Sequence, residues 1–399
     1  MLKQRDFIIL IINYFAAQTS RFSQYTILIW IILQDSQSAF SVAFVGVCAF
    51  LPYIIFGTWG GIIADRFQRK YVLIFMQSLL FCSSTILLVL FYKYTSTYLI
   101  AYIAIFFNGL IYVIEKPSKS LAIRDLLDSG SLTRALALVG FTVQASRMIG
   151  PLLGGFLISL VGIKYSYSPI LAIHMFTVLT LFLVKIPVSF KDSVSFDRNT
   201  FLSDIRISLD YFINQRTLLA VMLITITVHL FASSYFQMIS VVATNKFNVG
   251  SGLTGFLMSC EGMGSILGFS NIMIMNKIEY HGRLFCFGAL VMCIGVLLFS
   301  LSNNFVLAAV LIVMTGFGFS SFAIMFENII LRIVPIYLQG RVLGIGNFVI
   351  GFQIIGALFM GTLSKYLGAS TAMTITSIMG ILTILVIVNR IKDINKKIL

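Results

Sequence analysis

The ten residues Gly61-Ile62-Ile63-Ala64-Asp65-Arg66-Phe67-Gln68-Arg69-Lys70 separate two long apolar runs, and this alternation organises the whole chain. Residues 40–64 before the stretch and residues 71–92 after it are each long enough to cross a bilayer, which takes about 20 apolar residues. Of the 399 residues, 59% are hydrophobic and 11% are charged, against about 45–50% and about 25% in soluble domains. A water-soluble globule is therefore excluded, and lipid must surround most of the chain.

Twelve apolar runs, each bounded by charged or turn-rich breaks, are predicted as membrane-spanning helices. They cover residues 7–33, 40–64, 71–92, 97–122, 134–160, 167–187, 217–243, 252–276, 284–301, 305–331, 342–364 and 369–389. An extended polar stretch separates the sixth run from the seventh. We therefore expect an all-α membrane protein with an N-terminal six-helix half (1–187), a cytoplasmic linker (188–216) and a C-terminal six-helix half with a short cytoplasmic tail (217–399).

Basic residues gather on one side of the predicted membrane. If the N-terminus is cytoplasmic, the inner loops and both termini hold most loop cations, and the outer loops hold only Lys93, Lys164, Lys246 and Lys365. This asymmetry predicts a multi-pass protein of the cytoplasmic membrane with both termini inside. It also accounts for the net charge of +14 through topology and contact with anionic lipid, so we expect no nucleic-acid partner.

The two halves repeat weakly. The sequence GPLLGG from Gly150 to Gly155, followed by Gly162, recurs as GALFMG from Gly356 to Gly361, followed by Gly368. Glu115 in the fourth run likewise recurs as Glu327 in the tenth. Two six-helix halves with an internal repeat are the layout of secondary transporters, which bind their substrate near the midplane.

The stretch from Gly61 to Lys70 resembles the GxxxDRxxRK loop motif of the major facilitator superfamily, and it falls in the expected inner loop. The resemblance implies two pseudo-symmetric halves and a cytoplasmic gate, in which the charged cluster holds the halves together when the cavity faces outward. Its gating residues would be Gly61, Asp65, Arg66, Arg69 and Lys70. The alternative is an ordinary basic loop that only fixes topology, and the counterpart Lys277–Arg283 is degenerate.

The GPLLGG sequence resembles the end of the antiporter motif of proton-coupled drug exporters in this superfamily. Gly150, Gly154 and Gly155 would permit close helix contact, and Pro151 would allow the helix to bend. Ser146 stands where that motif has a glycine, so a general packing seam is the alternative. Residues 117–134 and 338–342 further resemble the twelve-span group that contains macrolide efflux proteins and siderophore exporters.

Polar side chains follow the helical period on three predicted helices of the first half. Inside lipid such groups cost about 2.5 kcal/mol or more, so they are functional candidates. The stripes are Tyr14, Gln18, Arg21 and Tyr25; Asn108, Tyr112, Glu115 and Lys119; and Gln144, Arg147 and Pro151. The resemblance places these helices around the central cavity, which makes Arg21, Gln18, Tyr25, Tyr112, Gln144 and Arg147 the candidate substrate-binding residues.

Proton coupling needs titratable groups inside the spans. Glu115, Glu261 and Glu327 are the carboxylates there, and His229 is a further candidate. A carboxylate beside a cation can change its protonation when its surroundings change. A structural ion pair, such as Glu115 with Lys119 or Arg147, is the alternative for the carboxylates, and a packing role is the alternative for His229.

Arg21 indicates the charge of the cargo. Related exporters often carry an acidic residue near this position, whereas Arg21 and Arg147 would make the wall electropositive. Because guanidinium groups bind carboxylates in pairs of hydrogen bonds, an anionic cargo such as a carboxylate-rich siderophore is favoured. If Glu115 neutralises both arginines, the pocket would instead suit macrolide-like or other lipophilic drugs. A lysophospholipid transporter and a non-transporting receptor are further alternatives.

The sequence therefore predicts an efflux protein that exports a small organic molecule by alternating access, in exchange for protons. Its expected partners are the substrate anion, protons and the lipid bilayer, and we expect a monomer. No GxxxxGK[ST] loop is present, and no reactive constellation lies at membrane depth, so we expect neither an enzyme nor a cofactor. The five scattered cysteines are predicted to be small buried hydrophobic residues and not metal ligands.

Overall fold

The computed structural model describes residues 2–93, 97–126, 132–186, 214–275, 278–335, 342 and 348–397. Helices make up these residues almost entirely, and no strand occurs among them. Contacts divide the chain into a first unit, Met1–Ser193 with Asn248–Ser259, and a second unit, Val194–Phe247 with Cys260–Leu399. Most of the predicted linker, residues 188–213, lies outside the described residues.

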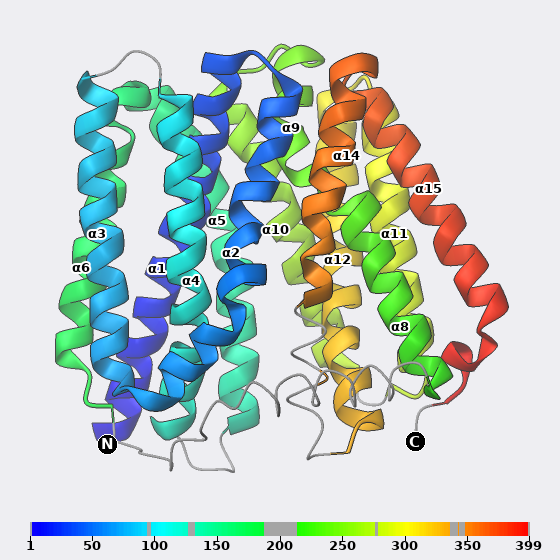
Figure 1. Ribbon diagram of the computed structural model, residues 1–399, viewed down its shortest axis with the longest axis horizontal. Coiled ribbons are helices and arrows are strands. Elements are labelled where there is room, and N and C mark those ends of the chain that lie inside the picture. Colours follow the sequence, from blue (N-terminus) through cyan, green and yellow to red (C-terminus); the bar gives the residue numbers. More distant parts are fainter. Residues whose placement is uncertain are drawn as a thin grey trace. The chain divides into compact units, whose positions relative to one another are not determined.

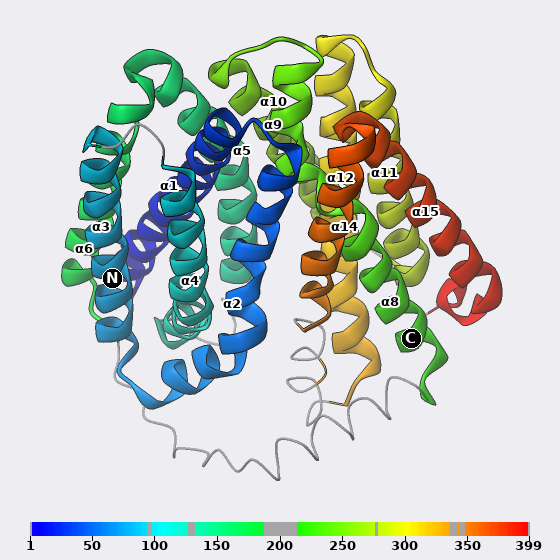
Figure 2. The ribbon, with the colours of Figure 1, turned by 45° about the horizontal axis from the view of Figure 1, so that its top comes forward.

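The first unit contains six long helices (Figure 1). They are α1 (Leu2–Ser36), α2 (Ala39–Arg66), α3 (Arg69–Lys93), α4 (Tyr98–Leu126), α5 (Leu132–Tyr165) and α6 (Tyr167–Leu183). α1 packs against α4, α5 and α6, while α2 packs against α4 and α3 against both α4 and α6. Figures 1 and 2 show α2 running alongside α4.

The second unit continues the series of helices. They are α8 (Arg216–Thr227), η1 (Val228–Ala232), α9 (Tyr235–Asn245), α10 (Ser251–Ile274), α11 (His281–Leu301), α12 (Phe305–Ile333), α14 (Phe352–Leu367), α15 (Ala369–Arg390) and η2 (Lys392–Asn395). The first turns of α10 cluster with the first unit. The predicted span 217–243 is one continuous helical path through α8, η1 and α9, and η1 is a π-helical turn within it.

A helix occupies each predicted range, and nine of the described helices are long and apolar enough to cross a membrane. α1, α6 and α10 are not among the nine, and α6 has only 17 residues. The all-α membrane fold is therefore confirmed, whereas the count of twelve crossings stays a prediction.

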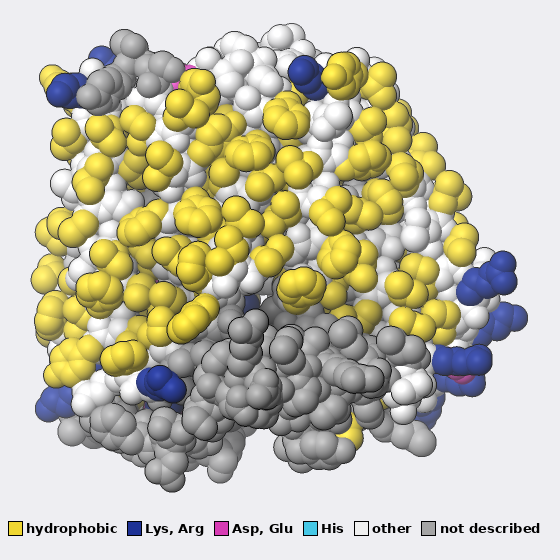
Figure 3. Space-filling model, in the orientation of Figure 1, with side chains coloured by type: hydrophobic (Ala, Val, Ile, Leu, Met, Phe, Trp, Pro, Cys, Tyr) yellow, Lys and Arg dark blue, Asp and Glu magenta, His cyan; other side chains and the backbone are white. Residues whose placement is uncertain are grey.

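The surface of the helices is apolar. Figure 3 shows hydrophobic side chains over most of the helix surface in that view, with lysine and arginine gathered near the helix ends. Ile103 is 69% exposed and Leu160 is 76% exposed, as expected for side chains that face lipid. Two cysteines correct our expectation: Cys48 is half-buried, and Cys82 is exposed, because it lies on the outward side of α3 in an apolar groove between α3 and α4.

Glycines of α5 bring it against α1. A Cβ atom at position 154 would lie 2.6 Å from the carbonyl oxygen of Ser23, so the two backbones touch there. Gly150 faces the same helix one turn away, and Ser146 is accommodated because it accepts a hydrogen bond from Thr19 at 3.2 Å. The sequence GPLLGG is thus a helix-packing seam.

The backbone repeats where the sequence repeats. Gly162 in the first unit has φ 74° and ψ 169°, and Gly368 in the second has φ 82° and ψ 155°. Both residues are in a positive-φ region that favours glycine. Gly162 interrupts α5 just before its end, and Gly368 lies between α14 and α15. The seam also recurs, because a Cβ atom at Gly356 would lie 2.7 Å from the carbonyl oxygen of His229 in η1.

The packing seam can be tested with one methyl group. Gly154→Ala should lower the stability of the protein by about 1–3 kcal/mol, because the added carbon meets backbone that cannot move away easily. Gly57→Ala is the matched control, since no atom lies within 4 Å of a Cβ atom there. Thermal unfolding of both variants in detergent measures the difference, and equal melting temperatures would contradict the contact.

Candidate functional site

Arg21 is held among aromatic side chains of the first unit. Its guanidinium carbon lies 3.3 Å from the centre of the Tyr112 ring on α4. Its Nη2 atom donates a hydrogen bond of 3.3 Å to the hydroxyl of Tyr53 on α2. The rings of Tyr53 and Tyr112 are themselves 6.0 Å apart. Stacking on an aromatic face fixes a guanidinium and leaves its edge available to a ligand.

Two small cavities adjoin Arg21. The first encloses about 10 Å³, close to the minimum for one water molecule, and the second encloses about 50 Å³. Residues of α1, α3, α4 and α6 line the first, namely Ala17, Gln18, Arg21, Gln24, Leu80, Asn108, Tyr112, Glu115 and His174. Residues of α1, α2 and α4 line the second, namely Arg21, Tyr25, Leu28, Ala49, Ile105, Asn108 and Gly109.

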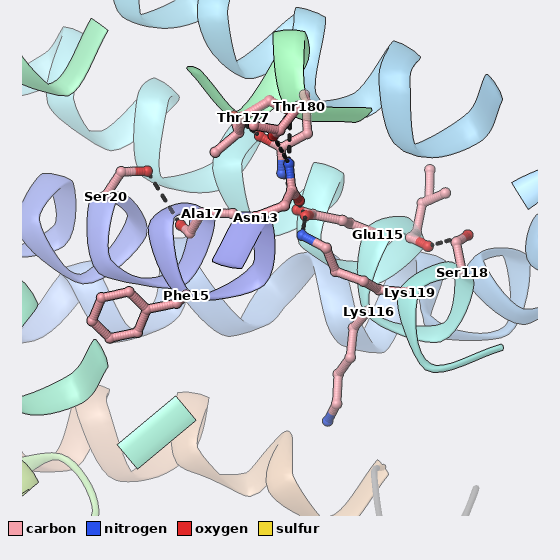
Figure 4. Close-up of polar contacts among 12 residues, drawn as sticks. Asn13, Phe15, Ala17, Ser20, Glu115, Lys116, Ser118, Lys119, Thr177 and Thr180 are labelled. Atoms are coloured by element: carbon pink, nitrogen blue, oxygen red, sulfur yellow. Dashed lines mark hydrogen bonds and ion pairs between the residues drawn. The ribbon is translucent and has the colours of Figure 1, made fainter. Parts of the chain in front are cut away.

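Glu115 forms a buried ion pair with Lys119 one turn along α4. The Lys119 Nζ atom lies 2.9 Å from Glu115 Oε1, and the two side chains are 1% and 6% exposed. Gln77 on α3 donates a second hydrogen bond of 2.5 Å to the same oxygen. Figure 4 shows the pair beside Asn13 of α1, with Lys116 pointing away from it. The ion-pair alternative for Glu115 is therefore what the structure contains.

Further hydrogen bonds tie α6 to this pair. Thr177 donates to Gln77 Oε1 at 2.9 Å. Asn13 donates to the Thr177 carbonyl at 2.7 Å and to the Thr180 hydroxyl at 2.9 Å, as Figure 4 shows. Four helices, α1, α3, α4 and α6, thus share one buried polar cluster.

The stripe predicted on α5 lies elsewhere. Gln144 and Arg147 are half-buried, and neither lines the two cavities beside Arg21. The backbone of α5 stays helical through Pro151 and leaves helical geometry at Gly162. The structure therefore brings together the predicted residues of α1 and α4, and it places those of α5 outside the two cavities.

Two of the five predicted gate residues are bonded within the first unit. Arg69, at the start of α3, forms a buried ion pair with Asp125 near the end of α4. Lys70 donates to the Phe182 carbonyl near the end of α6 at 3.1 Å, and Arg66 is exposed. Gly61 and Asp65 belong to α2, but their side-chain positions lie outside the described residues.

In the second unit, the C-terminal segment covers the loop that corresponds to the gate motif. Ile394 of η2 is fully buried, Arg283 donates to the Asn395 carbonyl at 3.2 Å, and Lys397 pairs with Glu279 at 3.1 Å. A hydrogen bond from Lys396 lowers the pKa of Asp393 below its usual range. Lys277 lies outside the described residues.

The second unit holds the other titratable candidates in three different settings. Glu261 is 1% exposed on α10, whereas Glu327 is exposed on α12. His229 is 8% exposed in the π turn η1. Its Nδ1 atom lies 3.4 Å from Gln353 Oε1 and 3.3 Å from the hydroxyl of Ser233.

Sequence reasoning missed several residues of these clusters. Tyr53, Gln77, Asp125 and Gln24 all contact predicted site residues. Gln77 and Gln24 are polar residues inside apolar runs, so the cost of burying them was an available signal. Nothing comparable marks Tyr53, because tyrosine is also common at membrane surfaces.

This arrangement has the groups needed to bind an anion. Arg21 supplies a fixed positive charge and hydrogen-bond donors, and the tyrosines, Gln18 and Asn108 supply neutral polar groups. Across the described part of the chain, no group of three His, Cys, Asp or Glu residues is arranged to hold a metal ion.

The ion pair on α4 can be tested by a double-mutant cycle. Glu115→Gln should lower the free energy of unfolding by about 3–5 kcal/mol, because it leaves the Lys119 charge buried without its partner. Glu115→Gln combined with Lys119→Met should recover much of that loss. Lys119→Met alone completes the cycle. Thermal unfolding measures all three variants, and simple addition of the two single losses would contradict the pairing.

The chain matches the family described as "Transmembrane secretion effector", which is a family of the major facilitator superfamily, over residues 1–397. It is 24% identical over 365 residues to the staphyloferrin A transporter of Staphylococcus aureus, covering 89% of this chain and 88% of that protein. It is also 24% identical to the uncharacterized MFS-type transporter YfiS of Bacillus subtilis, with 87% and 82% covered.

Solved structures share the fold. A POT family transporter in complex with 5-aminolevulinic acid aligns with a TM-score of 0.80 at 12% identity, covering 98% of this chain and 97% of that chain. A bacterial homologue of the human lysosomal transporter Spinster aligns with a TM-score of 0.70 at 13% identity, covering 99% and 98%. The chain therefore belongs to the transmembrane secretion effector family of the major facilitator superfamily, and it is a multi-span membrane transporter.

Proposed function

We propose that this transporter exports a carboxylate-rich siderophore across the cytoplasmic membrane by alternating access, in antiport with protons. The observation that carries the proposal is Arg21, a cation fixed by Tyr112 and Tyr53 beside two cavities in the first unit. A carboxylate accepts paired hydrogen bonds from a guanidinium, so an anion is the ligand that best matches this group.

The charge of Arg21 is available to a ligand because its surroundings do not neutralise it. Within the described residues, no carboxylate forms an ion pair with Arg21. Glu115, the acidic residue that lines the same cavity, is bound instead by Lys119 and Gln77. This arrangement supports an anionic cargo over the lipophilic-drug alternative, which requires Glu115 to neutralise the arginine.

The other proposed substrate-binding residues are assigned from their positions relative to the two cavities. Gln18, Tyr25 and Tyr112 line the cavities with Arg21, and we include Gln144 and Arg147 of α5 as further contacts of a larger cargo. The relative named as the staphyloferrin A transporter supports a cargo of the siderophore class.

The coupling and gating roles belong to the same proposal. Protons would bind at Glu261, Glu327, Glu115 or His229, and the buried Glu261 is the leading site because it is 1% exposed. Gly61, Asp65, Arg66, Arg69 and Lys70 would form the cytoplasmic gate. Gly150 and Gly154 would let α5 bend against α1, and Pro151 and Gly155 would let it bend against the first turns of α10. The protein would work as a monomer with both termini in the cytoplasm.

Uptake into inverted membrane vesicles with an acidic interior tests the proposal. We expect uptake of staphyloferrin A that collapses when the pH gradient is removed. Arg21→Gln should reduce this uptake at least about tenfold, because a hydrogen bond to a charged group contributes about 1.5–3 kcal/mol. Arg390→Gln is the matched control, since Arg390 is exposed at the end of α15.

The cargo alternatives appear as other outcomes of this experiment. Uptake of a macrolide in place of staphyloferrin A, unaffected by Arg21→Gln, would support a multidrug pump and would refute the proposed anion site. Uptake of a lysophospholipid alone would support the lipid alternative. Binding without movement of any of these compounds would mean a receptor.

Proton coupling is tested by a separate variant. Glu261→Gln should remove the dependence of uptake on the pH gradient while exchange of cargo between two equal pools continues, because the substrate site stays intact. Glu279→Gln is the matched control, since Glu279 lies at the surface paired with Lys397. Gradient-driven uptake at the wild-type rate in both Glu261→Gln and Glu327→Gln would exclude these two residues as proton carriers.

A further inference from the structure

His174 is a buried titratable residue that the proposed mechanism does not use. It lies on α6, is 1% exposed, and lines the first cavity together with Arg21. Its Nε2 atom is 2.6 Å from Nε2 of Gln24 on α1, and the hydroxyl of Ser20 lies 3.4 Å from it. A titratable ring beside an anion site is a candidate for linking proton and anion binding.

Gln24 connects His174 to the wall of the cavities. Its amide nitrogen also donates to the hydroxyl of Ser84 at 2.8 Å. Its amide oxygen accepts a hydrogen bond of 2.9 Å from the amide nitrogen of Asn108. Asn108 lines both cavities with Arg21, so a row of three hydrogen-bonded side chains leads from His174 to the anion site.

The donor and acceptor of each hydrogen bond in this row depend on the protonation of His174. An amide nitrogen only donates, so the present arrangement requires His174 Nε2 to accept, and the single proton of the neutral ring is then on Nδ1. In this state Asn108 donates through its nitrogen to Gln24, and its carbonyl oxygen, which has no hydrogen-bond partner among the described residues, is the acceptor left for the cavities. Oxygen is an acceptor and offers nothing to an anion.

A proton on Nε2 reverses every bond in the row. The Gln24 amide must then turn so that its oxygen accepts from His174, and the Ser84 hydroxyl can donate to that oxygen. The Gln24 nitrogen now points to Asn108, whose amide turns in response and accepts through its oxygen. The Asn108 nitrogen becomes the atom left for the cavities, where it adds a donor beside Arg21.

We propose that His174 controls anion binding at Arg21 by setting the orientation of the Gln24 and Asn108 amides. The anion site takes a carboxylate more tightly when His174 is protonated, and a bound carboxylate in turn favours the protonated ring, because linkage is reciprocal. The proposal rests on the anion site of the proposed function and adds a residue that couples it to protons.

The charges around His174 support the same coupling. Within the described residues, Arg21 on α1 and Glu115 on α4 are the charged groups that line the cavity with it, and Lys119 is bonded to Glu115. From α3, the neutral groups Ser84 and Gln77 belong to the same cluster. Glu115 attracts a proton to the ring and Arg21 repels it. An anion at Arg21 weakens that repulsion.

Citrate binding to the full-length protein in lipid nanodiscs tests the proposal. Radiolabelled citrate is measured at pH 5.5 and pH 7.5 on the wild type and on His174→Gln, which keeps hydrogen-bonding groups but does not titrate. The charge of citrate itself changes with pH in the same way for both proteins. The ratio of their citrate affinities therefore reports only a change in the protein. We expect wild-type affinity to exceed that of the variant about tenfold at pH 5.5 and to equal it at pH 7.5.

Two further variants distinguish the effect of this hydrogen-bonded row from a general effect of substituting a buried residue. Gln24→Met breaks the row without adding charge and should lose the same pH-dependent advantage. His281→Gln makes the same chemical change at the start of α11 and should behave as the wild type. An unchanged affinity ratio for His174→Gln at both pH values would overturn the proposal.

The experiment also distinguishes failure of the His174 proposal from failure of the anion site at Arg21 on which it rests. Arg21→Gln should abolish citrate binding at both pH values, and wild-type binding by that variant would refute the anion site itself. If His174→Gln fails to fold, labelled-histidine NMR on His229→Gln with His281→Gln observes His174 alone, because the chain has 3 histidines. A ring that stays neutral at both pH values with citrate bound would overturn the proposal.

Discussion

Direct backbone contact at glycine is the constraint on which the helix packing depends. Between helices in lipid, the hydrophobic effect gives little attraction, so close van der Waals contact must supply it. Gly154 brings α5 onto the carbonyl of Ser23 in α1, and Gly356 brings α14 onto the carbonyls of η1. Where the helices approach this closely, the polar side chains between them are enclosed and must satisfy one another.

The polar interior of the first unit follows from that enclosure. Glu115 and Lys119 neutralise each other within one helix, and amides and hydroxyls of Gln77, Thr177 and Asn13 complete their surroundings. Arg21 differs because aromatic faces stabilise it instead of a carboxylate. This cluster therefore contains one balanced pair of charges, and Arg21 beside it is a cation that can attract a ligand.

Hydropathy and helical period predicted much of this structure. The run 305–331 became α12 (Phe305–Ile333), and the stripes on α1 and α4 do share one cluster. Period alone could not show which helices would meet, so Tyr53 on α2 and Gln77 on α3 were missed. Period also could not separate Glu115 from Glu327, which repeat in sequence but differ in burial. A signal was available, since the lysine one turn after Glu115 is a leucine one turn after Glu327.

The π turn η1 adds one residue to the helical path from α8 to α9. The amide of Ser233 bonds to the Val228 carbonyl, five residues earlier, so this turn holds one residue more than an α-helical turn. Insertion of a single codon is enough to create such a turn, and the helix on either side keeps its own faces. If the halves arose by gene duplication, their alignment should show a gap between residues 228 and 232, where one copy gained a residue and, with it, the position of His229.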